Sequence, residues 1–176
     1  MNTENNMRSP FLYIKNFIGI GLKKLRFPGR FRAGAIQTFD RLHVEIYKKG
    51  EISLGSYNQN RGDLYLVADG GKLTIGDHCF FNTGTCITSV ESVKIGNNCK
   101  FGNNVVIVDH DHNFRKETSE EFISSEVVIE DNVWVGAGTV ILRGSRIGAG
   151  AVIGAGSVIK GEISSESVIV QRRNNC

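Results

Sequence analysis

Aliphatic residues return at every sixth position through the C-terminal part of the chain. The series is Ile129, Val135, Ile141, Ile147, Ile153 and Ile159, and smaller residues recur two positions before each of them. On a helix, each step of six would rotate by about 240° and spread these residues over three sides. A single strand of this length would far exceed the usual strand. Short strands broken by turns at a fixed phase remain, and they predict a parallel β-helix.

Earlier parts of the chain show the same pattern less regularly. One run of core positions is Ile75, Phe81 and Ile87, and the next is Ile95, Phe101 and Ile107. Gly-Asp or Gly-Asn pairs follow several of these positions, where a corner needs residues that tolerate unusual dihedral angles. Aliphatic pairs at wider spacing continue upstream, so the first coil is expected to begin near residue 40.

Two phrases carry a resemblance to a known family: Val-Trp-Val-Gly-Ala-Gly at 133–138 and Ile-Gly-Ala-Gly-Ser-Val at 153–158. They resemble the hexapeptide-repeat proteins, most of which are acyltransferases. The resemblance implies an all-β solenoid, a left-handed parallel β-helix with three hexapeptides in each triangular coil. An eighteen-residue step would then stack Ile129, Ile147 and the position near Ser165. A short N-terminal helix and a protruding active-site loop complete the expected fold.

Composition is consistent with one folded domain. The chain has 176 residues, with 21 glycines against 2 prolines, as repeated turns require. The cysteines show no CxxC spacing, and Cys79 and Cys99 share one phase of the repeat. Buried free thiols are therefore expected, and they favour a reducing compartment, the cytoplasm. The net charge of +3 is too small to indicate a nucleic-acid partner.

Basic and apolar residues alternate at helical spacing near the N-terminus. We expect residues 1–35 to form an amphipathic basic helical segment, 36–170 the β-helix, and 171–176 a short tail. The helix is too charged to span a bilayer. Two interpretations stay open and are compatible: the helix caps the open end of the solenoid, or it contacts an anionic membrane surface as a peripheral anchor.

The repeat is interrupted between Ile107 and Ile129, where twenty-two residues intervene. We read this spacing as four residues more than one coil and predict a projecting loop at 108–126. Loops on a rigid scaffold commonly carry function, and this one contains His110 and His112. An imidazole can accept a hydroxyl or amine proton at neutral pH. Asp109 and Asp111 are adjacent, as in constellations where a carboxylate orients the base.

Here the resemblance sharpens to the sugar O-acetyltransferases, including galactoside, maltose and polysaccharide acetyltransferases. The segment from Ile75 to His112 aligns with the galactoside enzymes without a gap, and His112 then falls on the catalytic base. His110 is the second candidate for that role. Asn82 matches an asparagine of the acceptor pocket, and Asp109 and Asp111 are further candidates for binding the acceptor. Gly84 stands where those enzymes have another pocket asparagine.

The later coils resemble the part of the family that binds acetyl-CoA, which would be the second substrate. Small residues there would let the pantetheine lie along the prism, and the oxyanion would be stabilised by a backbone N–H within 136–138. The candidate contacts are Trp134, Gly136, Ala137, Ala155, Lys160 and Arg172. The family also implies direct transfer in a ternary complex and a homotrimer with the site between subunits.

The favoured function is therefore acetyl-CoA-dependent O-acetylation of a sugar, glycan or polysaccharide precursor. N-acetylation of an amino sugar or amino acid is the alternative within the family. Outside it stand a γ-type carbonic anhydrase and a non-catalytic β-solenoid. A His-x-His metal site would need further ligands, and only His43 and His78 remain. We expect no metal, and we expect His78 to be a corner residue beside Asp77.

Overall fold

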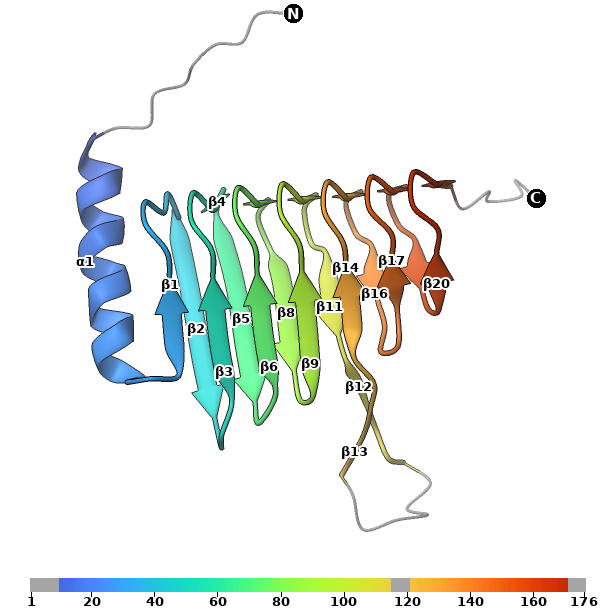
Figure 1. Cartoon of the computed structure of the whole chain (residues 1–176), viewed down its shortest axis with the longest axis horizontal. Helices are drawn as coiled ribbons and strands as arrows, with labels where there is room; N and C mark the ends of the chain where they lie inside the picture. Colours follow the sequence, from blue (N-terminus) through green and yellow to red (C-terminus); the bar gives the residue numbers. More distant parts are fainter. Residues whose placement is uncertain (1–9, 115–120, 171–176) are drawn as a thin grey trace, which may run out of the picture.

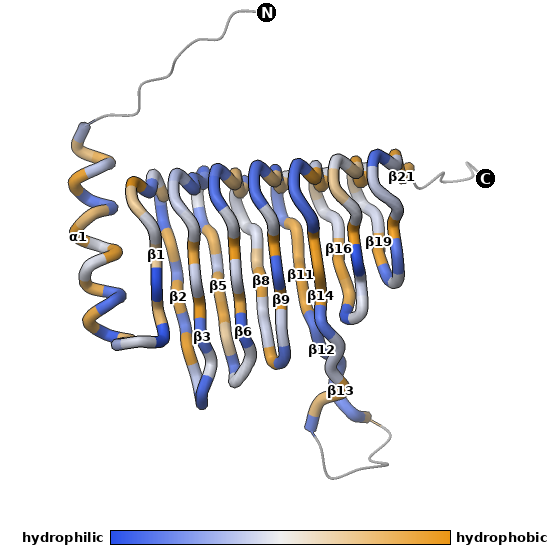
Figure 2. Tube along the Cα trace, in the orientation of Figure 1, coloured by the Kyte–Doolittle hydropathy of each residue, from blue (hydrophilic) through white to orange (hydrophobic). Residues whose placement is uncertain are grey.

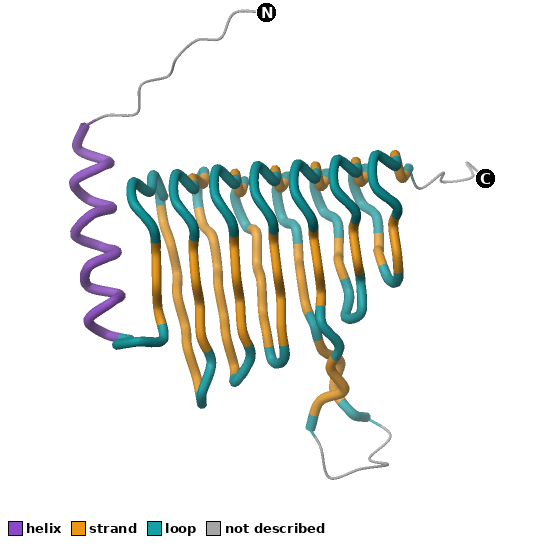
Figure 3. Tube along the Cα trace, in the orientation of Figure 1, coloured by secondary structure: helices purple, strands orange, loops and turns teal. Residues whose placement is uncertain are grey.

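The computed structural model describes residues 10–114 and 121–170. One helix, α1 (Pro10–Arg26), precedes a parallel β-helix (Figure 1). Strands form the flat faces and turns form the corners (Figure 3). Within the described residues, no helix is long and apolar enough to cross a bilayer.

Three parallel sheets make the faces of a triangular prism, and the chain visits them in the order A, B, C. Sheet A contains β1 (Phe31–Ala33), β3 (Glu51–Leu54), β6 (Lys72–Ile75), β9 (Ser92–Ile95), β14 (Val127–Ile129), β17 (Arg146–Ile147) and β20 (Glu162–Ile163). Sheet B contains β4 (Gln59–Asn60), β7 (Phe80–Phe81), β10 (Lys100–Phe101), β15 (Trp134–Val135), β18 (Val152–Ile153) and β21 (Val168–Ile169). Sheet C contains β2 (Arg41–Tyr47), β5 (Asp63–Asp69), β8 (Thr85–Ser89), β11 (Val106–Val108), β16 (Val140–Ile141) and β19 (Val158–Ile159).

The six-residue series forms the core, as predicted. Ile129, Ile141, Ile147 and Ile159 are all buried, and each such side chain contributes about 1.5–3 kcal/mol relative to its exposed state. Apolar residues alternate with polar ones along the strands (Figure 2). Ile129 stacks on Ile147 as expected.

The last coil is shorter than the predicted step. Ile147 pairs with Ile163, whereas we expected a position near Ser165. Ile163 follows Ile159 by four residues, and the turn between them uses Gly161 at a φ of 89°. This tighter C–A corner removes two residues from the coil, so the prediction of a constant eighteen-residue step is wrong here.

The interruption is much larger than four residues. Ile107 lies in sheet C and Ile129 in sheet A, so the two do not stack on each other. Ile107 instead stacks on Ile141, thirty-four residues later. The insertion is therefore close to a whole coil, and it leaves the prism at the C–A corner as a hairpin (Figure 1).

The A–B corners are stabilised by a ladder of side-chain oxygens. The Oδ1 atoms of Asp77, Asn97 and Asp131 each accept a hydrogen bond from a backbone N–H of the preceding coil, at 2.6–2.8 Å. His78 follows Asp77 with a φ of 58° and stacks on Tyr57 at a centroid distance of 4.9 Å. The prediction that His78 is a corner residue is confirmed.

The prediction of buried free thiols is confirmed for Cys79 and Cys99, whereas Cys86 is only partly buried and Cys176 lies outside the described residues. Cys79 and Cys99 are fully buried and free, and their thiols donate to the carbonyls of Gly96 and Glu130 at 3.1 Å. The contact with Cys99, together with burial, raises the pKa of the Cys79 thiol far above its ordinary value. These thiols are core residues.

The first coil begins earlier than predicted. β1 already pairs with β3 in parallel, at Phe31↔Ile52. The boundary expected after residue 35, and the coil start expected near residue 40, both fall inside this coil. α1 lies across its open end (Figure 1), where Asn16 exchanges two hydrogen bonds with the backbone of Phe39.

Candidate active site

The hairpin consists of two short antiparallel strands, β12 (His110–His112) and β13 (Phe122–Ser124). His110 pairs with Ser124, and His112 pairs with Phe122. A bond from Ser125 N–H to the Asp109 carbonyl, at 2.9 Å, closes its base. Both candidate histidines are therefore on regular backbone, close to the rigid prism.

Asp109 anchors the hairpin to the preceding coil. Its buried carboxylate accepts hydrogen bonds from the N–H groups of Val90 and Glu91 at 2.8 and 2.9 Å, and from Ser89 Oγ at 2.9 Å. Ser89 ends β8, and Val90 and Glu91 form the turn between β8 and β9. A buried carboxylate whose oxygens are taken in this way holds backbone in place and cannot reach an acceptor. The expectation that Asp109 binds the acceptor is therefore corrected.

Asp111 ties the hairpin to the following coil. Its Oδ2 lies 2.6 Å from Nε of Arg143, which sits in the turn after β16. The Asp111 side chain keeps 45% of its surface exposed, so one carboxylate oxygen remains near solvent. The two aspartates thus clamp the base of the hairpin between successive coils.

The two histidines differ in how they are held. Nδ1 of His110 lies 3.0 Å from Oδ1 of Asp109, and only 14% of its side chain is exposed. An imidazole whose Nδ1 donates to a carboxylate leaves Nε2 as the acceptor, the form that a general base needs. His112 is exposed. Both rings contact Phe122, each at a centroid distance of 4.9 Å.

The remaining acceptor candidate, Asn82, lies on a different corner. It follows β7 and precedes β8, at the B–C corner, where its Oδ1 accepts from the N–H of Thr83 at 2.9 Å. The hairpin leaves the C–A corner. Within one chain the structure therefore does not bring Asn82 to the histidines.

The candidate acetyl-CoA contacts mostly follow Asn82 along the B–C corner. Ala137 and Ala155 occupy equivalent exposed positions after β15 and β18, and the exposed Trp134 is on the adjoining face of sheet B. Gly136 is different, because it is buried and a Cβ there would come within 2.5 Å of the Ala155 nitrogen. Packing between coils is a sufficient reason for glycine at this position.

Four expectations remain: the oxyanion contact, Lys160, Arg172 and the absence of a metal. The N–H groups of Gly136 and Gly138 donate to the carbonyls of Ile153 and Asn103, at 2.7 Å each, so neither is available to an oxyanion. Lys160 follows β19 at the C–A corner, on the same edge as the hairpin. Arg172 lies outside the described residues. In the part of the chain that the structure describes, no three His, Cys, Asp or Glu side chains are grouped as a metal site would require.

Sequence reasoning did not find Ser89, Phe122 or Arg143. Ser89 is the last residue of β8 and Phe122 the first of β13, and neither belongs to a motif. Arg143 could have been predicted from the repeat phase, if the length of the insertion had been predicted correctly. Because Ile107 and Ile141 share a phase, the residues after Ile141 lie directly beside the point where the hairpin leaves.

Two family models match the prism on either side of the hairpin. One is described as Bacterial transferase hexapeptide (six repeats) and matches residues 126–161. The other is described as Hexapeptide repeat of succinyl-transferase and matches residues 72–108. Over 136 residues the chain is 34% identical to the putative lipopolysaccharide biosynthesis O-acetyl transferase WbbJ of Escherichia coli (strain K12), an alignment covering 70% of this chain and 69% of that protein.

The chain belongs to the hexapeptide-repeat acetyltransferase family. The predicted family and its left-handed parallel β-helix are thereby confirmed. The acetyltransferase is also 31% identical over 109 residues to the galactoside O-acetyltransferase of Lactococcus lactis subsp. lactis (strain IL1403), an alignment covering 60% of this chain and 52% of that enzyme. It therefore spans about half the length of that relative.

Solved structures share the fold of this acetyltransferase. A variant of AntD, an N-acyltransferase from Bacillus cereus crystallised with dTDP and coenzyme A, superposes with a TM-score of 0.65 at 19% identity, covering 83% of this chain and 81% of that one. The hexapeptide-repeat acetyltransferase VCA0836 from Vibrio cholerae gives a TM-score of 0.57 at 21% identity, covering 89% and 74%. At these identities the likeness is one of fold.

Proposed function

We propose that the protein transfers the acetyl group of acetyl-CoA to a hydroxyl of a sugar or glycan precursor. The observation that carries this proposal is the hairpin itself, because it holds two histidines beside a carboxylate in a segment that interrupts the repeat. The names of the two relatives above, both O-acetyltransferases, support the reaction class. Because acetyl-CoA is the donor, the reaction is placed in the cytoplasm.

In this mechanism His112 is the general base. Its imidazole takes the proton of the acceptor hydroxyl, and the oxygen attacks the thioester carbon. The tetrahedral intermediate then collapses, the carbon–sulfur bond breaks, and the sulfur leaves with the proton that the imidazolium returns. His112 is assigned this role because it is exposed and keeps the register of the galactoside enzymes. The contact between Asp109 and His110 favours the alternative, in which His110 is the base.

The separation of the two edges supports a site shared between copies of the chain. Asn82, Ala137 and Ala155 line the B–C corner, whereas the hairpin extends from the C–A corner. In a ring of three chains, the hairpin of one copy would lie against the B–C corner of the next. We therefore propose a homotrimer, with Trp134, Ala137 and Ala155 contacting acetyl-CoA. Lys160 and Arg172 would face its phosphates.

Thiol release tests this function directly. The purified protein is incubated with acetyl-CoA and a panel of sugars and amino sugars, and free coenzyme A is measured together with the mass of each product. Acceptor-dependent thiol release with an alkali-labile acetyl ester is the expected result. An acetamide product formed only with amino sugars would establish N-acetylation instead. No release above hydrolysis with any member of the panel would contradict the proposal.

A further inference from the structure

The helix α1 turns its apolar side away from the prism. Its two buried residues, Asn16 and Ile20, contact the first coil. Successive helical residues rotate by about 100°. The residues on the side of α1 opposite Asn16 and Ile20 can therefore be identified from the sequence. That side carries five exposed apolar side chains, here called the outer stripe: Phe11, Ile14, Ile18, Leu22 and Leu25. A helix that served only as a cap would place such residues on the prism.

The exposure of the outer stripe is unusual for a surface helix. Exposed fractions run from 56% for Ile18 to 79% for Leu25. Contiguous apolar patches of this kind mark interaction sites, whereas single exposed apolar residues are ordinary. Because α1 lies across the end of the prism (Figure 1), the stripe is the outermost surface of the described chain at that end.

Cations border the outer stripe along one side. By the same rotation, Lys15 and Arg26 lie along the margin next to Leu22, whereas Lys24 is turned toward the first coil, and none of the seventeen residues of α1 is acidic. Lys15 and Lys24 donate to the carbonyls of Asp40 and Ala33, which holds their ammonium groups toward the prism. An apolar helix face with a cationic margin and no acidic residue is the pattern of helices that lie in a membrane interface.

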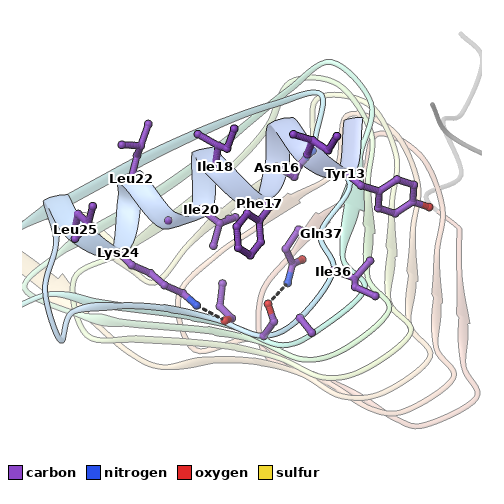
Figure 4. A pocket seen from close by; sticks show the side chains of 15 residues that line it. Tyr13, Asn16, Phe17, Ile18, Ile20, Leu22, Lys24, Leu25, Ile36 and Gln37 are labelled. Carbon is purple, nitrogen blue, oxygen red and sulfur yellow. Dashed lines mark hydrogen bonds between the residues drawn. The ribbon is translucent and has the colours of Figure 1, made fainter. Parts of the chain in front are cut away.

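A cavity opens between α1 and the first coil. Its volume is about 920 Å³, and its lining comes from residues 33–37 and from α1, including Ile14, Ile18, Leu22 and Leu25 of the outer stripe. Phe17 and Ile20 point toward the first coil, where Ile36 also lies, whereas Ile18 and Leu22 point away from it (Figure 4). The lining is apolar apart from a few polar groups, so hydrocarbon would be a suitable occupant.

We propose that α1 docks this protein on an anionic lipid membrane. Charge decides between the possible occupants. A second copy packed stripe to stripe would bring together two basic helices with no acidic residue between them, at an energetic cost. An anionic bilayer accepts the outer stripe among its acyl chains and places its phosphates beside the cations. Each basic residue near such a surface strengthens binding by ~1 kcal/mol, or about fivefold.

Vesicle sedimentation of the full chain tests the proposal. One set of vesicles contains phosphatidylcholine with phosphatidylglycerol, and the other contains phosphatidylcholine alone. The protein should pellet with the anionic vesicles, and less so as salt rises. Combining Ile14→Ser, Ile18→Ser and Leu25→Ser should weaken partitioning by at least ~100-fold, given the apolar area removed. Arg26→Gln should weaken it about fivefold.

Val168→Ser is the matched control, because Val168 is equally exposed but lies in the last coil at the far end of the prism. It should bind vesicles like the wild type, and all variants should keep the wild-type melting temperature and acetyl-transfer rate on a soluble acceptor. The proposal would be overturned if the wild-type protein did not sediment with anionic vesicles, or if the triple variant bound them with wild-type affinity. If the triple variant instead dissociates a wild-type oligomer that has no vesicle affinity, the outer stripe is a contact between copies.

Discussion

At the scale of single residues, the two hairpin histidines have different surroundings, and this difference makes their roles testable. His112→Ala is expected to lower turnover by roughly 10²- to 10⁴-fold, the usual contribution of a positioned base. The affinity for acetyl-CoA should barely change, because the proposed contacts of Trp134, Ala137 and Ala155 with the donor lie at or beside another corner. Steady-state kinetics and equilibrium titration with acetyl-CoA provide the two measurements.

His110→Ala is the paired variant. If His110 only orients the hairpin, its replacement should be milder than that of His112. The contact with Asp109 gives the opposite outcome a physical basis. Abolished turnover in His110→Ala with retained turnover in His112→Ala would exchange the roles. If neither variant loses activity, the hairpin is not the active site.

The two aspartates provide a matched comparison of stability. Asp109→Asn keeps the shape but turns an amide donor toward Val90 N–H, Glu91 N–H or Ser89 Oγ, groups that now donate to the carboxylate. The free energy of unfolding should fall by about 1–3 kcal/mol, the cost of an unsatisfied buried group. Asp111→Asn removes a half-exposed ion pair with Arg143 and should cost only about 0–1 kcal/mol. Chemical denaturation measures both, and equal losses would contradict the anchoring role of Asp109.

Asp63 gives a pH-dependent prediction. Hydrogen bonds from Arg41, and then from His43, hold the pKa of the Asp63 carboxyl well below its usual range. A carboxyl with a lowered folded-state pKa contributes stability above its unfolded pKa of about 3.9, and this contribution is lost as the pH falls toward the folded value. The difference in unfolding free energy between wild type and Asp63→Asn should therefore be present at neutral pH and shrink below about pH 4. A constant difference across this range would contradict the assignment.

At the scale of elements, replacing each of two glycines by alanine should change the stability of the fold in opposite directions. Gly136→Ala forces a Cβ to within 2.5 Å of the Ala155 backbone and should destabilise the prism by about 1–3 kcal/mol. Gly19, in α1, has nothing within 4 Å of its ideal Cβ. Gly19→Ala should stabilise the protein by up to ~1 kcal/mol through helix propensity. Thermal unfolding of both variants measures the sign, and a neutral Gly136→Ala would disprove the close packing of the coils.

The repeat pattern predicted the elements well, because a side chain that stacks on its own equivalent must recur at a fixed phase. The core positions from Ile75 to Ile159 follow from this alone. The pattern could not give the length of each coil, because a turn such as that at Gly161 changes length without disturbing the core positions on either side. For the same reason, the size of the insertion after Ile107 was misjudged.

The candidate site was predictable only in part. The interruption and its histidines are visible in the sequence. The contacts of Asp109 and Arg143 depend on which turns lie next to the hairpin, and that follows from the coil length. The separation of Asn82 from the histidines depends on which corner each turn occupies, so it emerged only from the three-dimensional arrangement.

At the scale of the whole molecule, a shared site predicts complementation between two inactive chains. Ala155→Trp would block the B–C corner, and His112→Ala would disable the hairpin. In mixed trimers assembled at random, about a quarter of the interfaces would join an intact hairpin to an intact corner. Co-expression should therefore restore about a quarter of wild-type turnover. Singly expressed variants are the controls, and a mixture as inactive as they are would place the whole site within one chain.

The hairpin departs and returns without changing how the coils stack. Ile107 pairs with Ile141, and Val127 pairs with Val93. The same pairings would form if a short turn joined sheets C and A in place of the hairpin. The core pairings on either side of the hairpin therefore do not depend on His110 or His112. Substitutions at these two positions can change the chemistry that we propose for the hairpin, while the prism keeps its stacking.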